Sequence, residues 1–153
     1  MSFDVLGCLA CDLTAGREPP PGGVILDSGS WRVEHCVGPL GVGTLIVKPL
    51  RHVLHVADLT VEEAAELGPI LQLAASIVTD LLQPEQVYVC LWSHAGGVPG
   101  HIHYVVQPVS RELMDRHATH GPALQVAMFA AGEPLPADEV EAFCERARLA
   151  AAR

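Results

Sequence analysis

Short apolar runs, separated by clusters of Gly, Pro, Asp and Ser, predict β-strands over much of the chain. The turn-forming cluster 27–30 between the first two runs predicts a β-hairpin. The Gly-rich stretch 95–100 is expected to be a loop between the last two strands. The predicted strands cover residues 24–26, 31–36, 44–47, 87–93 and 101–107.

The longest helical pattern begins after Thr60. Apolar residues recur at close to a 3.6-residue spacing from Leu67 to Leu82. The segment Thr60–Glu63 has the form of a capping box, and Pro69 is expected to bend the helix because it lacks an N–H. One long helix among several strands predicts an α+β domain around a mostly antiparallel sheet.

The residues after Pro108 predict three further helices, at 110–120, 122–131 and 136–153. The last has an apolar stripe along one side. We therefore expect residues 1–108 to form the domain that holds the site. Residues 109–153 are expected to form a helical C-terminal extension, packed on that domain or on a dimer partner.

Composition narrows the class of protein. The 153 residues are 50% apolar, which excludes extended disorder and fits one compact domain. With 9 Lys plus Arg against 18 Asp plus Glu, the net charge is -9, which argues against a nucleic-acid surface. A small anionic ligand remains compatible with this charge, because backbone amides, imidazoles or a metal can bind it locally.

The apolar runs also bear on membranes and compartment. The most apolar stretch, 67–82, is interrupted by polar residues and falls short of the roughly 18 apolar residues that a membrane span needs. The first residues, MSFDVLGCLACD, show no basic segment ahead of an apolar block. We therefore expect no membrane association and a cytoplasmic location.

The chain has five cysteines, an odd number that does not suit a disulfide framework. The pair in Cys8-Leu9-Ala10-Cys11 is typical of half a metal site or of a redox pair. A redox pair is the weaker of the two readings, because no parallel βαβ pattern follows the motif.

A second candidate motif is His101-Ile102-His103, in the last predicted strand. Side chains alternate between the two faces of a strand, so both histidines share a face. Imidazoles there could bind a metal, transfer protons or attack phosphorus. The alternation places His101, His103, Val105 and Gln107 on one face and Ile102, Tyr104 and Val106 on the core side.

Taken together, these motifs resemble the histidine-triad (HIT) superfamily. The resemblance covers residues 8 to about 108 and implies an antiparallel sheet of about five strands with one main helix, usually built as a homodimer. It rests on three pieces in a fixed order, namely Cys8-x-x-Cys11, the segment 43–52 that ends in His52, and Gly96-Gly97-Val98-Pro99-Gly100-His101-Ile102-His103.

The resemblance implies one structural zinc ion. In zinc-containing HIT proteins, two cysteines near the N-terminus, a histidine after a Pro-x-x motif and the first histidine of the triad hold the metal. Carried over, the ligands are Cys8, Cys11, His52 and His101. Two thiolates and two imidazoles complete a tetrahedral shell, as expected of a structural site.

The resemblance also implies a nucleophile. The middle histidine of the triad attacks a nucleoside α-phosphate and forms a covalent nucleotidyl intermediate, and its position here is His103. The third histidine is replaced by Val105, so the triad is incomplete. Gln107, one step farther along the same face, and His94, in the preceding loop, are the candidates to replace its contact with phosphate.

Substrate contacts differ from the family pattern as well. The polar residues that bind phosphate there correspond to Gly97 and Val98, which leaves the task to backbone amides. The acidic residue that usually holds the ribose hydroxyls aligns with Cys36, whose thiol is a poor acceptor. The expected phosphate and ribose contacts are Gly96, Gly97, Gly100, Ser93, His94 and Cys36.

Three functions are compatible with these residues. The first is a zinc-stabilised nucleotide phosphohydrolase or nucleotidyltransferase that uses His103. The second is a nucleotide-binding protein with little catalysis. The third is a related enzyme that acts on another phosphorylated metabolite. The expected partner is thus a small nucleotide or phosphorylated molecule, together with a second copy of the chain.

Overall fold

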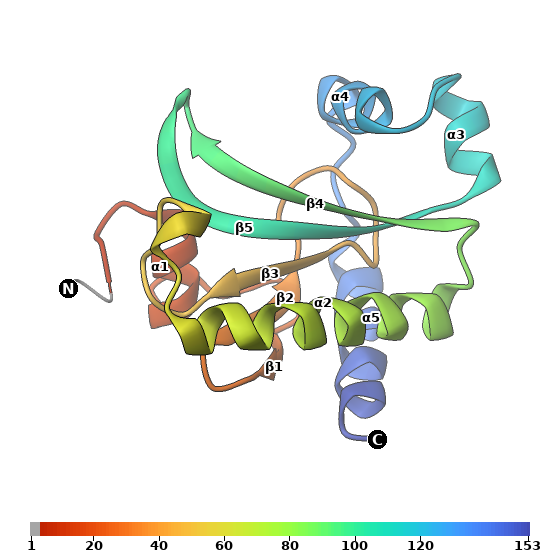
Figure 1. Ribbon diagram of the computed structural model, residues 1–153. Helices are drawn as coiled ribbons and strands as arrows, with labels where there is room; N and C mark the ends of the chain where they lie inside the picture. The colour runs from red at the N-terminus through yellow and green to blue at the C-terminus, as the bar shows by residue number, and fades with distance from the viewer. Residues whose placement is uncertain (1–3) are drawn as a thin grey trace.

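The fold is built on a five-stranded antiparallel sheet with the strand order β1-β2-β3-β5-β4 (Figure 1). The computed structural model describes residues 4–153. The α+β class and the antiparallel sheet predicted from the sequence are confirmed. The strands are β1 (Val24–Asp27), β2 (Trp31–His35), β3 (Leu45–Pro49), β4 (Gln86–Ala95) and β5 (Val98–Val109).

Helices cover both faces of this sheet. The long helix α2 and the C-terminal helix α5 pack on one face, and α4 lies across the other (Figure 1). The helices are α1 (Leu9–Ala15), α2 (Val61–Leu82), α3 (Arg111–His117), α4 (Pro122–Ala131) and α5 (Ala137–Ala151), with a 3-10 turn, η1, at Val56–Asp58.

The start of α2 has the predicted capping box. Thr60 Oγ1 accepts the Glu63 N–H at 3.1 Å, and Glu63 Oε2 accepts the Thr60 N–H at 2.8 Å. Among the described helices, α2 has the length and apolar composition to cross a membrane. In this fold its buried side chains, Ile70, Ala74, Ile77 and Val78, pack in the main core.

Alternation along the strands separates two cores. On the face covered by α2 and α5, the buried strand residues are Trp31, Val33, Leu45, Val47 and Val106. On the opposite face, Cys36, Val105 and Val109 pack with Leu124 and Met128 of α4. The second face is only partly covered by α4, and it carries the candidate site.

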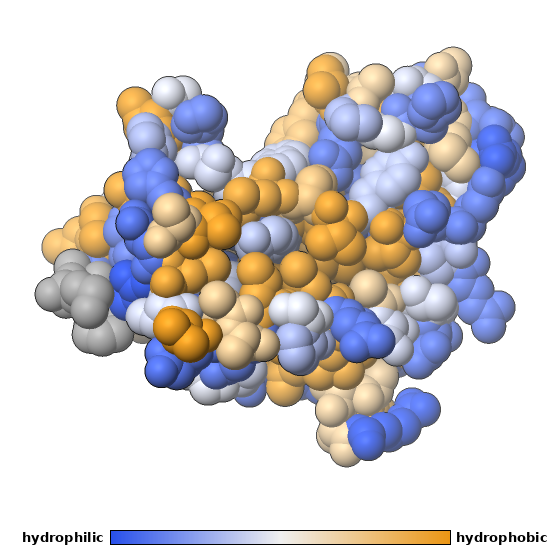
Figure 2. Space-filling model, viewed as in Figure 1, coloured by the Kyte–Doolittle hydropathy of each residue, from blue (hydrophilic) through white to orange (hydrophobic). Residues whose placement is uncertain are grey.

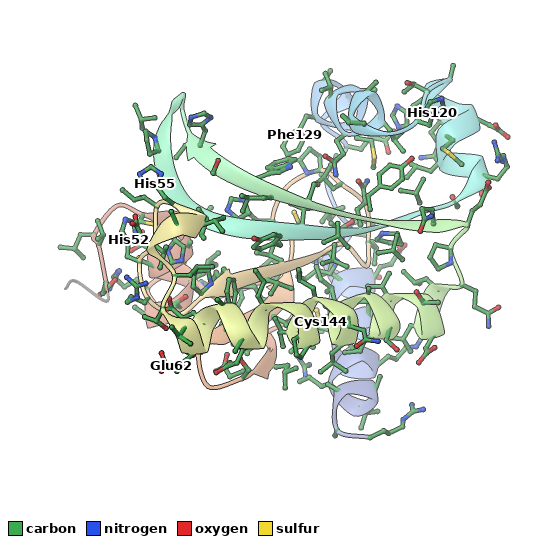
Figure 3. The ribbon with its side chains drawn as sticks, in the orientation of Figure 1. His52, His55, Glu62, His120, Phe129 and Cys144 are labelled. Carbon is green, nitrogen blue, oxygen red and sulfur yellow. The ribbon has the colours of Figure 1, made fainter. Side chains whose placement is uncertain are left out.

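The C-terminal residues form part of the same folded unit. Helix α5 contributes Phe143 and Cys144 to the main core, behind α2 (Figure 3). The packing is tight, because a Cβ added to Gly22 would lie 2.6 Å from the Cys144 sulfur. The extension expected from the sequence therefore packs, through α5, on the sheet of its own chain.

The link between β4 and β5 is shorter than predicted. The expected loop 95–100 is a two-residue turn, with β4 reaching Ala95 and β5 beginning at Val98. Gly96 and Gly97 both have positive φ, 60° and 82°. This is the backbone that a tight two-residue hairpin requires and that glycine adopts without strain. The consequence is a long hairpin that projects from the sheet (Figure 1).

Candidate active site and metal centre

Four predicted ligands meet at the N-terminal end of α1. The ligand atoms of Cys8, Cys11, His52 and His101 lie within 4.8 Å of one another. The Cys11 sulfur is 3.3 Å from His52 Nδ1 and 3.6 Å from His101 Nδ1, and the Cys8 sulfur is 3.9 Å from His101 Nδ1. Sulfur and nitrogen ligands of a tetrahedral zinc lie about 3.5–3.6 Å apart. The cluster is therefore able to hold a metal ion.

Local structure explains this convergence. Cys8 is the N-cap of α1 and Cys11 lies in its first turn, so the two thiols share one side of the helix. His52 follows β3, and His101 lies on the neighbouring strand β5. His101 Nε2–H donates to the Pro49 carbonyl at 2.9 Å, which leaves Nδ1 unprotonated and facing the sulfurs.

Burial sets the protonation of this cluster. It lowers the pKa of His101 to about 4, so this imidazole is neutral, as a metal ligand must be. It raises the pKa of Cys11 to about 11, so this thiol keeps its proton until a metal replaces it. Binding of a metal here would therefore release protons, and its binding free energy would contribute to the stability of the fold.

His103 lies two residues beyond the cluster, on the same strand. Its Nδ1 is 3.0 Å from the His101 carbonyl oxygen. A carbonyl only accepts, so Nδ1 carries the proton and Nε2 keeps its lone pair. Burial, followed by the nearby Lys48 charge, lowers the pKa of His103. His103 is thus a neutral imidazole with Nε2 available, the form that nucleophilic attack requires.

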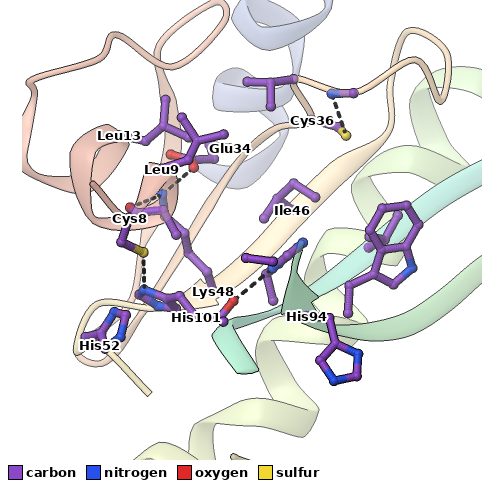
Figure 4. A pocket seen from close by; sticks show the side chains of 18 of the residues that line it. Cys8, Leu9, Leu13, Glu34, Cys36, Ile46, Lys48, His52, His94 and His101 are labelled. Carbon is purple, nitrogen blue, oxygen red and sulfur yellow. Dashed lines mark hydrogen bonds and ion pairs between the residues drawn. The ribbon is translucent and has the colours of Figure 1, made fainter. Parts of the chain in front are cut away.

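His103 and the metal cluster line one pocket of about 640 Å³ (Figure 4). The surface dips between the hairpin tip and the α3–α4 lobe (Figure 2). Pockets of about 300–1,000 Å³ are typical of small-molecule sites. Its apolar wall includes Leu9, Cys36, Ile46, Trp92, Val105 and Phe129, and its polar groups include Glu34, Lys48, His94, His101 and His103.

Several predicted contacts lie in this pocket beside His103. These are Cys36, His94 and Gly100, and Val105, which replaces the third histidine, also lines the pocket. Gly96 and Gly97 are at the hairpin tip and are not among the lining residues. Ser93 lines a separate, smaller pocket of about 170 Å³. Of the three glycines in this segment, Gly100 is therefore the one that lines the main pocket, beside Ala95 and Pro99.

Gln107 does not lie where a phosphate partner of His103 would be. It is fully buried, its Nε2–H donates to the Leu40 carbonyl at 3.3 Å, and its Oε1 accepts from Gln125 at 3.1 Å. Helix α4 covers this stretch of the sheet face, which removes Gln107 from the pocket. The expectation that Gln107 replaces the third histidine is therefore corrected.

Two features of the pocket were not predicted. Lys48 and Glu34 form an ion pair at 2.5 Å, with each side chain 1% exposed. The strand pattern contained a signal for this ion pair. Glu34 pairs with Ile46, and Lys48 lies two residues after Ile46, so both charged side chains fall on the same face of the sheet. The second feature is Phe129, which reaches from α4 toward the hairpin and lies 5.0 Å, between ring centroids, from Trp92 (Figure 3).

Comparison with known proteins identifies the fold. The sequence matches no family model and no curated protein. A HIT-like protein involved in cell-cycle regulation from Bartonella henselae has a TM-score of 0.72 at 14% identity, over 94% of this chain and 96% of that one. A hypothetical histidine triad nucleotide-binding protein from Sulfolobus tokodaii has a TM-score of 0.71 at 14% identity, over 95% and 92%.

A Zn-bound histidine triad family protein from Mycobacterium smegmatis is also similar, with a TM-score of 0.67 at 18% identity, over 96% of this chain and 94% of that one. These structures span nearly the whole chain, the C-terminal helices included. The chain therefore has the histidine-triad fold.

Proposed function

We propose that this protein is a zinc-stabilised HIT-type enzyme that acts at the α-phosphate of a nucleotide, as a phosphohydrolase or a nucleotidyltransferase. The observation that carries the proposal is the state of His103. This imidazole is neutral, its Nδ1–H is held by the His101 carbonyl, and its Nε2 is left to a pocket of nucleotide size. The name of the Sulfolobus tokodaii protein, nucleotide-binding, supports a nucleotide as the ligand.

The chemistry has two steps. His103 Nε2 attacks the α-phosphorus, an N–P bond forms, and the bond to the leaving group breaks with its electron pair on that group. Water or an acceptor hydroxyl then attacks the same phosphorus, loses its proton, and returns the electron pair to Nε2. Besides His101 and His103, His94 and the backbone at Gly100 are polar groups of the hairpin that line the pocket.

The metal role follows from the ligand set. Cys8, Cys11, His52 and His101 would hold zinc with all four positions filled by protein, which suits a structural ion. Such an ion would cross-link α1 to β5 two residues before His103.

A second candidate is a nucleotide-binding protein with little turnover. Val105 favours it, because this fully buried residue lies one step from His103 on the same face and has no donor for a phosphate oxygen.

Turnover of a substrate panel tests the proposal. Adenosine 5′-phosphoramidate, dinucleoside polyphosphates and nucleotide sugars would be incubated with wild type, His103→Ala and His120→Ala. His120, on the α3–α4 connection, is the matched control because it lies outside the pocket (Figure 3). We expect His103→Ala to lower nucleotide release by at least about 1,000-fold. Binding without turnover, unchanged in His103→Ala, would favour the second candidate.

We further propose a homodimer. Strand β4 is an edge of the sheet and leaves Val89 and Leu91 exposed, at 45% and 38%. Figure 2 shows apolar surface over the middle of this side of the molecule. Light scattering should give twice the chain mass of 16.3 kDa, and a value near the chain mass itself would contradict the dimer.

A further inference from the structure

The ion pair in the pocket wall leaves one atom without a partner. Glu34 Oε1 accepts from Lys48 Nζ, which also donates to the Ala10 carbonyl at 2.9 Å. Within residues 4–153, Glu34 Oε2 is the buried side-chain oxygen or nitrogen that has no hydrogen-bond partner. A buried, unsatisfied carboxylate oxygen destabilises a fold, and an apolar pair would avoid that cost. The atom therefore calls for a functional explanation.

Strand register relates Glu34 to the nucleophile. Glu34 pairs with Ile46 on β3, and Ile46 pairs with Val105 on β5. Val105 is two residues from His103, so Glu34 and His103 share one face of the sheet. They lie two strands apart and two residues out of register, so their backbones are about 12 Å apart. A ligand whose phosphorus meets His103 can thus extend its far end toward Glu34.

The neighbouring residue on this face cannot serve as the acceptor. Cys36 follows Glu34 by two positions and lines the same pocket. Its sulfur already accepts the Gly38 N–H at 3.2 Å, and burial raises the pKa of the thiol to about 11. The thiol is neutral and a weak acceptor. Glu34 is the carboxylate that lines this part of the pocket (Figure 4).

We propose that Glu34 Oε2 determines which nucleosides the pocket accepts, by taking a hydrogen bond from an O–H or N–H donor at the end of the ligand farthest from His103. The donor is a ribose hydroxyl or an amino group of the base. Lys48 orients the carboxylate by donating to Oε1. The bond forms away from water, where a charged acceptor discriminates strongly. This inference rests on the proposed function, which places the reacting phosphate at His103.

Binding of three nucleotides to the wild-type protein tests the inference. The probes are AMP, 2′,3′-dideoxyadenosine monophosphate, which lacks the ribose hydroxyls, and purine riboside monophosphate, which lacks the amino group. We expect one analogue to bind about 10- to 100-fold more weakly than AMP, and that analogue identifies the donor. Equal affinity for all three nucleotides overturns the inference, irrespective of how the variants described below bind them.

A double variant links the discrimination to Glu34. Glu34→Leu with Lys48→Met removes both buried charges together, so that neither is left unpaired. It should bind AMP and the weaker analogue equally. The matched control is Glu66→Gln, because Glu66 is a carboxylate on α2 that accepts hydrogen bonds from Ser28 and Ser30 outside the pocket. This control should keep the wild-type discrimination.

The outcomes separate the two proposals. If the wild type binds AMP and the double variant still discriminates as the wild type does, the role of Glu34 is overturned and the proposed function stands. If the wild type binds neither these three nucleotides nor any member of the substrate panel, the proposed function is overturned and the role of Glu34 with it.

Discussion

His103 donates its Nδ1–H to the backbone carbonyl of His101, 3.0 Å away. His101 directs its own Nδ1 toward the cysteines of the metal cluster. Two histidines on the same strand therefore face different places, one the cluster of candidate metal ligands and the other the pocket. Because the acceptor belongs to the backbone of a proposed metal ligand, a metal bound at the cluster would also order the proposed nucleophile.

Metal content is the first prediction. Protein purified without chelator should carry about one zinc per chain, and Cys11→Ser should lose most of it, because the four-ligand shell is broken. Removal of zinc should also lower the free energy of unfolding, since the cluster joins α1 to β3 and β5. Metal analysis and thermal unfolding measure the two effects.

Cys90→Ser is the control for this prediction. Cys90 is also a free cysteine, but it contacts Gln125 and lies outside the cluster. It should keep the wild-type zinc content. An equal zinc content in Cys11→Ser and Cys90→Ser would contradict the assignment of Cys11 as a metal ligand.

Phe129 should contribute to ligand binding. It lies beside Trp92 in the pocket and is 41% exposed, so Phe129→Ala should affect the pocket more than the core. Aromatic contacts contribute about 0.5–1.5 kcal/mol, so affinity for a nucleotide should fall about 3- to 10-fold. Titration calorimetry measures this change. Val126→Ala, at an exposed position of the same helix, is the control, and an equal effect of both would contradict the role of Phe129.

The turn before β3 depends on Gly43. Its φ is +93°, and an added Cβ would lie 2.4 Å from Leu82 Cδ1. Gly41 has a similar φ of +91° but more space, since the nearest atom, in Met128, would be 3.8 Å away. Both alanine variants should lose about 1–2 kcal/mol from backbone strain. Gly43→Ala should lose about 1–3 kcal/mol more from overpacking. Urea unfolding measures both, and equal losses would contradict the steric account.

Acid should destabilise the protein partly through His35. Its Nδ1–H donates to the Cys36 carbonyl and its Nε2 accepts the Gly43 N–H, and burial lowers its pKa below the ordinary 6.5. Between these two pKa values the unfolded chain binds the extra proton. The free energy of unfolding therefore decreases as the pH falls from 6.5 toward the folded-state pKa.

A variant isolates this contribution. His35→Gln can keep a donor and an acceptor but cannot take up the proton. It should lose less stability than wild type between about pH 7.5 and about pH 5.5, although its stability at the higher pH can be lower. Denaturant unfolding at several pH values gives both slopes. The same slope in both proteins would show that His35 does not titrate in this way.

Much of the fold is predictable from local pattern. The capping box at Thr60 and the apolar period that follows it predict α2, because both depend on neighbours in sequence. The strands follow from apolar runs and turn residues. The pair Gly96–Gly97 contained the hairpin signal, but the surrounding glycine and proline extended the predicted loop to residues 95–100.

Long-range packing explains what the sequence did not predict. Helix α1 was not predicted, because it has only seven residues and two candidate metal ligands, Cys8 and Cys11, lie at its start. The burial of Gln107 depends on α4, which is separate in sequence and returns over the sheet. The pairing of Glu34 with Lys48 depends on the alignment of β2 and β3. In each case the deciding contact joins distant segments.

The central claim is that His103 forms a covalent bond to a nucleotide. The protein is mixed with substrate, and the reaction is quenched without acid because acid cleaves an N–P bond. The protein is then digested and its peptides are analysed by mass spectrometry. We predict a nucleotidyl adduct on His103, absent from His103→Ala and retained in His120→Ala. Turnover of the substrate with an adduct on another residue, or with none at any stage of the reaction, would contradict this mechanism.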